Sequence, residues 1–359
     1  MSLRFTSFYT ASALGVGNEQ TLANYRAGVA PGMVEIDGDI PGRRIWFGRV
    51  PAEFPEVPER RWNMRTNRLL QLALDAESSF AGLVARYGAD RVGVVLGASN
   101  TGIDEAQGFV DAWIDAPDGN PPSAFDFSMI ELGTPSLFLK DRLGVKGPAY
   151  TVSTACSSAT KAFGAARRLI ERGVCDAVVT GGVDGRCRFA MNGFHALGAL
   201  SEGRCRPLAE DRDGINLGEG VALFALERAS DGVALCGVGE SSDAYHATAP
   251  DPEGKGAEAA MRAALSDAGL APDGIDYVNL HGTGTQANDA MEMKAVARVF
   301  GSRMPRCEST KGLTGHCLGA AGAVEAAICA LQVRAGSCSA AISNSFAFGG
   351  SNASVILGA

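Results

Sequence analysis

The sequence predicts an α/β protein whose sheets are covered by helices. Apolar runs of strand length alternate along the chain with segments of helical periodicity. The 46 glycines have no collagen-like period and cluster in short turns between these runs, as tight strand-to-helix connections require. The 359 residues suffice for one large core or for two closely packed halves.

The expected strands are short and almost continuously apolar, as in sheets that are buried on both faces. Residues 1–17 are interrupted by polar side chains and predict a strand and a turn rather than a signal peptide. Further strands are expected at 91–97, 176–182, 221–226 and 277–281.

Helices are expected between these strands, at 68–85, 156–172, 255–269 and 289–300. The second of them should bury one face, because its apolar side chains recur at helical spacing and Gly173 follows it as a C-cap. The apolar positions are Ala159, Phe163, Ala166, Leu169 and Ile170.

Composition narrows the class of protein. The net charge of −8 and the lack of a basic stripe argue against a nucleic-acid partner. No run of 18 uncharged apolar residues occurs, so no membrane span is expected. The nine cysteines are odd in number and make no C-x-x-C pair, which predicts a reduced, cytoplasmic protein. Most are expected to be small buried residues: Cys175, Cys187, Cys236, Cys329 and Cys338.

Cys156 is the first candidate catalytic residue. It opens the expected helix 156–172, where unpaired N–H groups and the positive end of the helix dipole favour a thiolate. Two histidines follow on glycine-rich loops: His281 ends the strand 277–280, and His316 precedes a run of small residues. Lys311 has an apolar, glycine-rich setting that is unusual for a solvated lysine. A thiolate with two histidines indicates acyl-thioester chemistry.

Three other chemistries fit the sequence less well. The histidines have no partner at i+3 or i+4 and no Cys/His cluster has zinc spacing, so no metal site is expected. A cysteine hydrolase would use one histidine and leave the second histidine and the lysine without a role. The glycines form neither a Walker A loop nor a G-x-G-x-x-G turn, which disfavours a nucleotide.

Four ordered motifs resemble one family. They are S-T-A-C-S-S at 153–158, H-G-T-G-T at 281–285, K-G-L-T-G-H at 311–316 and N-S-F-A-F-G-G-S-N at 344–352. Together they resemble the β-ketoacyl-acyl carrier protein synthases of the elongating, Cys-His-His type. The resemblance implies a thiolase-like fold, with two similar halves in five layers, αβαβα, and a homodimer or a heterodimer with a related synthase. A change of segment near 230–232 fits a division into 1–230, with the cysteine, and 231–359, with both histidines.

The resemblance also implies a mechanism. Cys156 would take an acyl group from a carrier-protein thioester, and the backbone N–H groups of Cys156 and Phe348 would form the oxyanion hole. His281 and His316 would hold a malonyl thioester and stabilise the enolate left by decarboxylation.

The same resemblance assigns supporting residues. Lys311 and Glu292 would support the histidines, and Phe348 would gate the acyl pocket. The expected substrate-binding residues are Thr283 and Thr285, on the phosphopantetheine arm, together with Phe346 and Gly349. No cofactor of the enzyme itself is expected, since the phosphopantetheine arm arrives on the carrier protein.

The expected partner is an acidic acyl carrier protein that docks on a small basic patch. Four arginines between 60 and 68 suggest one location for it. The candidates are Arg61, Arg65 and Arg68, with Arg204 and Arg206 as a second group.

The pathway and one alternative stay open. Fatty-acid elongation is the default, and segments 29–33 and 65–68 are similar to synthases of aryl polyene clusters. The alternative is a non-catalytic partner like the chain-length factors, which lack the nucleophilic cysteine. Two departures from the family are visible: only 335–341 connects the last helix to the last motif, and Ala347 replaces a common glycine, where a methyl would restrict positive φ.

Overall fold

The fold consists of two matching series of strands joined edge to edge. The computed structural model describes residues 1–115, 119 and 126–359. The first series runs in the order β1 (Ser2–Ser12), β9 (Gly220–Ala229), β7 (Ala177–Asp184), β5 (Val92–Gly97) and β6 (Ala149–Val152). The second runs β10 (Val233–Ser242), β14 (Ser351–Gly358), β13 (Ala340–Phe346), β11 (Tyr277–Asn279) and β12 (Arg306–Glu308).

Both series have the same strand directions. In each, the first three strands are mutually antiparallel neighbours and the last two join in parallel. Two residue pairs between β1 and β10, Arg4 with Ala234 and Phe5 with Val233, link the series into one hydrogen-bonded sheet. The predicted division at residues 230 and 231 stays a prediction; it falls between β9 and β10, where the second series begins.

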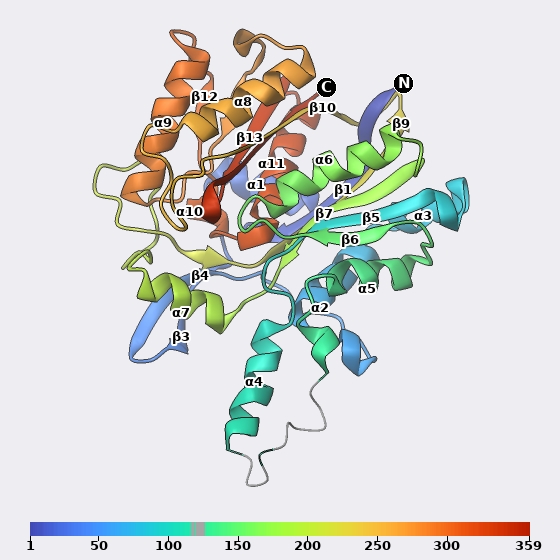
Figure 1. Cartoon of the computed structure of the whole chain (residues 1–359), viewed down its shortest axis with the longest axis vertical. Coiled ribbons are helices and arrows are strands. Elements are labelled where there is room, and N and C mark those ends of the chain that lie inside the picture. The colour runs from blue at the N-terminus through green and yellow to red at the C-terminus, as the bar shows by residue number, and fades with distance from the viewer. Residues whose placement is uncertain (116–118, 120–125) are drawn as a thin grey trace.

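Helices form three layers around the two series (Figure 1). An outer layer of α2 (Arg65–Ala76), α3 (Ser79–Tyr87) and α5 (Thr134–Leu143) packs on the first series. A central layer of α6 (Ser158–Glu171) and α11 (Ala321–Arg334) lies between the series. The opposite outer layer contains α8 (Lys255–Ala268) and α9 (Gln286–Phe300). The thiolase-like αβαβα architecture is therefore confirmed.

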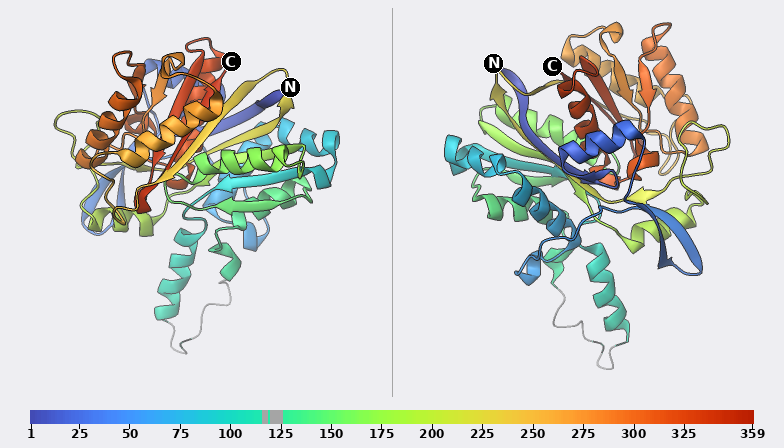
Figure 2. Two further views of the ribbon diagram at one scale, coloured as in Figure 1. Left: turned by 45° about the horizontal axis from the view of Figure 1, so that its top comes forward. Right: turned by 180° about the vertical axis from the view of Figure 1, so that it is seen from behind.

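The remaining elements surround this body (Figure 2). The helix α4 (Ile103–Ile114) projects from it, and a hairpin of β3 (Met33–Ile40) and β4 (Arg43–Gly48) pairs with β8 (Leu217–Gly218). The others are α1 (Asn18–Ala27), β2 (Gly15–Val16), α7 (Arg188–Ala196) and the short α10 (Lys311–Thr314). None of the helices in the described part of the chain has the length and apolar character needed to cross a membrane.

Two expected helices differ from the structure. The single helix predicted at 68–85 is wrong, because Glu77 is extended, with φ −130° and ψ 94°, and separates α2 from α3. Its carboxylate accepts a hydrogen bond from the Ser79 N–H at 3.1 Å and so starts the second helix. The nucleophile helix begins at Ser158 instead of Cys156, which moves the cysteine onto the preceding turn.

The cysteines fit a reduced protein. All nine are free, and of the five expected to be buried only Cys236 is half-buried.

Candidate active site

Cys156 lies on a sharp turn between β6 and α6. Ala155, just before it, has φ +52°, a left-handed conformation that an L-residue adopts only when the surroundings impose it. Ser158 secures the turn, since its Oγ accepts the Thr154 N–H at 2.9 Å and donates to the Ala155 carbonyl at 2.5 Å. The cysteine side chain is thereby aimed into the interior, where the residue is only 7% exposed.

The two histidines converge on this sulfur. His281 follows β11 and His316 follows α10, and both are buried. The Nε2 atom of His316 lies 2.9 Å from the Cys156 Sγ. The two imidazole rings meet edge to face, 5.3 Å between centroids and 83° between planes. The structure thus brings together three residues that are 35 to 160 positions apart in the sequence.

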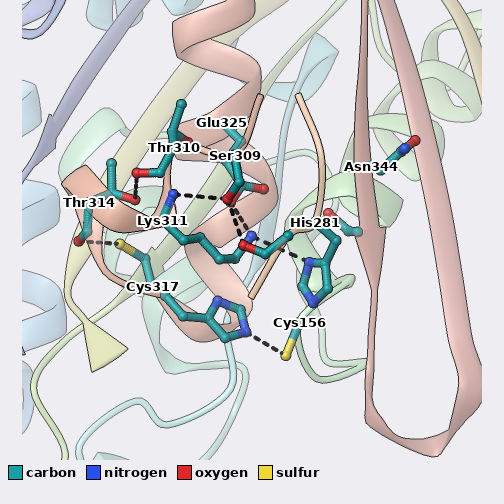
Figure 3. Close-up of polar contacts among 12 residues, drawn as sticks. Cys156, His281, Ser309, Thr310, Lys311, Thr314, Cys317, Glu325 and Asn344 are labelled. Carbon is teal, nitrogen blue, oxygen red and sulfur yellow. Dashed lines mark hydrogen bonds and ion pairs between the residues drawn. The ribbon is translucent and has the colours of Figure 1, made fainter. Parts of the chain in front are cut away.

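Lys311 contacts His281 and is itself held by a carboxylate, Glu325, that the motifs did not reveal (Figure 3). Its Nζ lies 3.4 Å from His281 Nδ1 and forms a fully buried ion pair with Glu325 of α11. A lysine ammonium can only donate, so His281 Nδ1 accepts and its Nε2 carries the proton. The available sequence signal was a lone carboxylate in the otherwise apolar segment 321–331.

Glu292, expected to support the histidines together with Lys311, contacts the loop that carries His281. Its carboxylate accepts the backbone N–H groups of His281 at 2.8 Å and Gly282 at 2.7 Å. Asn344 Nδ2 also donates to it at 3.2 Å. Glu292 thus fixes the backbone of the His281 loop, while the carboxylate that pairs with Lys311 is Glu325; the supporting role expected of Glu292 stays a prediction.

Burial sets the protonation of the three central side chains. Desolvation, together with the Lys311 charge, holds the pKa values of His281 and His316 well below that of an ordinary histidine, so both rings are neutral at pH 7. Burial raises the pKa of Cys156 to about 12, although the Lys311 charge and the Phe348 backbone N–H lower it. The thiolate expected from the helix end is thus wrong for the resting site.

This protonation predicts a specific pH dependence of alkylation. The rate at which iodoacetamide modifies Cys156 should rise about tenfold per pH unit from pH 7 to 9.5, because the thiolate fraction grows that way far below the pKa. Peptide mass spectrometry over this range measures the rate, with Cys156→Ser to assign the modified peptide. Levelling off below pH 8 would contradict the raised pKa.

A cavity of about 230 Å³ opens beside the sulfur and the two rings. Thr283 and Thr285 line it, with hydroxyl oxygens 3.0 Å apart. Phe346 also lines it, with its ring 6.3 Å from that of His281. Phe348 stacks on Phe194, at 5.5 Å and 22°, and this aromatic pair forms the wall next to the nucleophile. Phe194 was not identified by the motifs.

The loop at Ala347 is not strained by its methyl group. Ala347 has φ −102°, and the left-handed residues are Gly349 and Gly350, with φ +77° and +72°. The expected restriction of positive φ at Ala347 is therefore wrong. Gly349 lies outside the cavity lining, and its N–H donates to the Ala247 carbonyl at 2.8 Å.

Arg65 is a partly buried side chain, 26% exposed, that is held by an internal ion pair. Its guanidinium binds Glu219 in a bidentate pair, at 2.5 and 2.7 Å, and the Glu219 side chain is fully buried. Arg68 is half-buried and donates to the Asn63 side chain at 2.7 Å. The cluster of arginines at 60–68 therefore does not form one exposed patch.

The other candidate arginines are exposed. Arg61 lies over the Trp62 ring at 4.7 Å. Arg204 donates to the Gly312 carbonyl at 2.9 Å, and Arg206 pairs with Asp211 at 2.7 Å on the surface. Arg204 thereby contacts the residue that follows Lys311.

The sulfur and the two rings could also hold a metal ion. One donor atom from each of Cys156, His281 and His316 lies within 4.8 Å of the others, a grouping that sequence spacing did not reveal. The Lys311 ammonium beside His281 opposes a second positive charge there. The donor set therefore suits acyl chemistry better than a cation.

Comparison with known proteins agrees with this geometry. The family models described as the β-ketoacyl synthase N-terminal and C-terminal domains match residues 49–232 and 233–343. The 3-oxoacyl-[acyl-carrier-protein] synthase 2 of Staphylococcus aureus is 38% identical over 266 residues, covering 68% of this chain and 65% of that protein. The protein of the same name from Rhizobium meliloti is 37% identical over 314 residues, covering 74% of this chain and 73% of its own length.

Two solved structures share nearly the whole fold. One chain of a complex between the ketosynthase ApeO and its chain length factor ApeC, from Xenorhabdus doucetiae, has a TM-score of 0.94 and 40% identity, covering 99% of this chain and 98% of its own length. The ishigamide ketosynthase/chain length factor has a TM-score of 0.90 and 29% identity, with the same coverages. With Cys156, His281 and His316 in one cavity, the chain belongs to the β-ketoacyl synthase family.

Proposed function

We propose that the protein is a β-ketoacyl-acyl carrier protein synthase, an acyltransferase that condenses an acyl group on Cys156 with malonyl-carrier protein. The observation that supports this most is the contact of 2.9 Å between His316 Nε2 and the Cys156 sulfur, with His281 5.3 Å from His316. The chain spans only 65% of the length of the Staphylococcus aureus relative, so activity, substrates and partners are proposed on the site itself.

The reaction has two halves. In the first, the Cys156 sulfur attacks the acyl thioester, the new S–C bond forms, and the thiol proton ends on the departing phosphopantetheine sulfur. The backbone N–H of Phe348, which already reaches the Cys156 sulfur, would stabilise the tetrahedral oxyanion together with the Cys156 N–H.

In the second half, the malonyl carboxylate leaves as carbon dioxide and its bonding electrons form an enolate. The neutral rings of His281 and His316 would donate N–H bonds to that oxygen. The enolate carbon then attacks the carbonyl of the Cys156 thioester, the C–C bond forms, the C–S bond breaks, and the cysteine leaves as a thiolate that takes up a proton from water. Thr283 and Thr285 hydroxyls are the proposed contacts of the phosphopantetheine arm.

The binding partners and the cellular location follow from the same proposal. The carrier protein delivers both substrates, no cofactor beyond its arm is required, and the enzyme acts in the cytoplasm. A homodimer, or a heterodimer with a related synthase, is proposed because the ApeO and ishigamide structures are complexes of a ketosynthase with a chain length factor. A non-catalytic chain-length-factor role is disfavoured, since Cys156 is present.

Mass spectrometry tests the function. Incubation with an acyl-carrier protein should add the acyl mass to Cys156, and addition of malonyl-carrier protein should then release a 3-oxoacyl product. Cys156→Ala is the matched control and should gain no mass. A folded wild-type protein without an adduct would refute the proposal.

Carrier docking is expected at Arg204 and Arg206. The loop that carries them contacts the wall of the cavity, because Arg212 donates to the carbonyl of Thr285, which lines it, at 3.3 Å. The Leu208 N–H of the same loop binds Asp289 of α9 at 2.8 Å. Reversing both arginines to glutamate should raise KM for carrier-bound substrate and weaken its salt dependence, since rim charges mainly change the association rate.

The control for docking is a reversal far from this loop. Arg303→Glu changes an exposed arginine that pairs with Asp273 and should leave KM unchanged. A small pantetheine substrate should be used equally well by all variants. If Arg204→Glu with Arg206→Glu leaves carrier kinetics unchanged, the docking surface lies elsewhere.

A further inference from the structure

Asp184 is a buried carboxylate that the proposed mechanism does not use. It ends β7 and is fully buried, and no positively charged side chain contacts it among the described residues. Instead its oxygens accept four hydrogen-bond donors. Oδ1 accepts the Ser99 and Asn100 N–H groups, both at 3.0 Å, and Oδ2 accepts the Ser99 hydroxyl at 2.7 Å and the Gly319 N–H at 2.6 Å.

Because it binds the Gly319 N–H, this carboxylate contacts the turn that follows His316. Within this turn Leu318 has φ +49°, a left-handed conformation that needs an external restraint. A Cβ at Gly319 would lie 2.7 Å from Asp184 Oδ2 and within 2.9 Å of the backbone of residues 98 and 99. The turn is therefore pressed directly onto the carboxylate and the end of β5.

His316 is held on its other side by backbone alone. Its N–H donates to the Asn216 carbonyl at 2.8 Å, and its carbonyl accepts the Gly218 N–H at 2.9 Å. The imidazole, whose Nε2 lies 2.9 Å from the Cys156 sulfur, thus sits between two anchors, the β8 backbone and Asp184.

We propose that Asp184 is a positioning residue for His316: by binding Gly319 and the loop after β5, its carboxylate holds the 317–319 turn and so sets where the imidazole points. This inference rests on the proposed function. Asp184 also places a negative charge near the nucleophile: burial is the main cause of the raised pKa of the Cys156 thiol, and the charges of Glu325 and Asp184 add to it. The carboxylate therefore acts in two separable ways, which gives its test two readouts.

Asp184→Asn is the informative variant. The amide keeps one acceptor for Ser99 and Asn100 but turns an N–H₂ group toward the Gly319 N–H, so two donors oppose each other. Malonyl-carrier decarboxylation should fall about 10- to 100-fold in kcat, as misplacement of a catalytic group does, with little change in KM. Alkylation of Cys156 by iodoacetamide should rise, because the nearby negative charge is gone.

Glu227→Gln is the matched control. Glu227 is also a buried carboxylate, and Thr6, Arg86 and Tyr87 bind it away from the cavity. The Glu227→Gln change should lower thermal stability but should not make the decarboxylation rate fall while the alkylation rate rises. If Asp184→Asn does not fold, Ser99→Ala removes one donor and should show the same split more weakly.

The outcomes are distinct. A fall in decarboxylation with a rise in alkylation supports the role of Asp184. Two rates that fall by the same factor, or that match the wild type, overturn it. If the wild type itself neither decarboxylates malonyl-carrier protein nor becomes acylated, the proposed function fails, whereas the alkylation readout still reports the effect of Asp184 on the sulfur.

Discussion

Replacing His316 or His281 by alanine is expected to abolish malonyl decarboxylation while part of the acyl transfer to Cys156 survives. Enolate stabilisation needs both N–H donors, whereas attack on the acyl thioester needs the Cys156 sulfur and the backbone oxyanion hole. Loss of one oxyanion-type donor typically lowers the rate about 100- to 1000-fold. The Lys311 contact makes His281 a defined Nε2–H donor, so the His281→Ala variant should show this effect as His316→Ala does.

The two half-reactions are measured separately. Carbon dioxide release from malonyl-carrier protein reports the first effect, and mass spectrometry of acylated Cys156 reports the second. His195→Ala is the control, because this histidine lies outside the cavity and contacts Arg43 at 3.0 Å. Decarboxylation at the wild-type rate in either alanine variant would refute the role of that histidine.

Lys311→Met is expected to lower the free energy of unfolding by about 3–5 kcal/mol. The side chains of Lys311 and Glu325 are 0% and 2% exposed, so the variant leaves a buried carboxylate without its cation. Adding Glu325→Gln should recover most of the loss, since a buried pair replaced on both sides leaves no uncompensated charge. Urea unfolding of the single and double variants measures both effects.

The effect should grow with pH. Burial raises the pKa of Glu325 to about 7 even beside Lys311, and loss of the Lys311 ammonium should raise it further. In the variant the folded protein therefore keeps this carboxyl protonated, whereas in the unfolded chain it ionises as pH rises. The raised pKa therefore contributes stability that is fully present below the ordinary pKa of a glutamate and is lost as pH rises to the folded value, which lies higher in the variant than in the wild type, so the difference between the two proteins grows above pH 7. Equal destabilisation at pH 6 and pH 8 would contradict this reading.

An exposed ion pair gives the control for the loss of charge. Lys294 and Glu253 are 50% and 62% exposed, and Lys294→Met should change the free energy of unfolding by less than about 1 kcal/mol. A loss as large as that of Lys311→Met would show that burial does not explain the difference.

The sequence determined the elements and the chemistry because both depend on local patterns. Apolar periodicity, with glycine at the turns, predicted the alternation of strands and helices. The single helix that it predicted at 68–85 was wrong, because the backbone of Glu77 is extended. Cys156, His281 and His316 were identifiable because each lies in a distinctive short motif of the family. These features need no knowledge of which segments meet in space.

Only the tertiary structure decided which groups pair and which are charged. Glu292 follows His281, and Glu325 follows His316, at a short distance in sequence. Lys311 pairs with Glu325 because α11 packs beside α10 in the fold. Arg65 meets Glu219 from 154 positions away, and its side chain is only 26% exposed. At Cys156 a helix end and burial act in opposite directions, and burial dominates because it desolvates the sulfur, a property of the packed core that no local motif encodes.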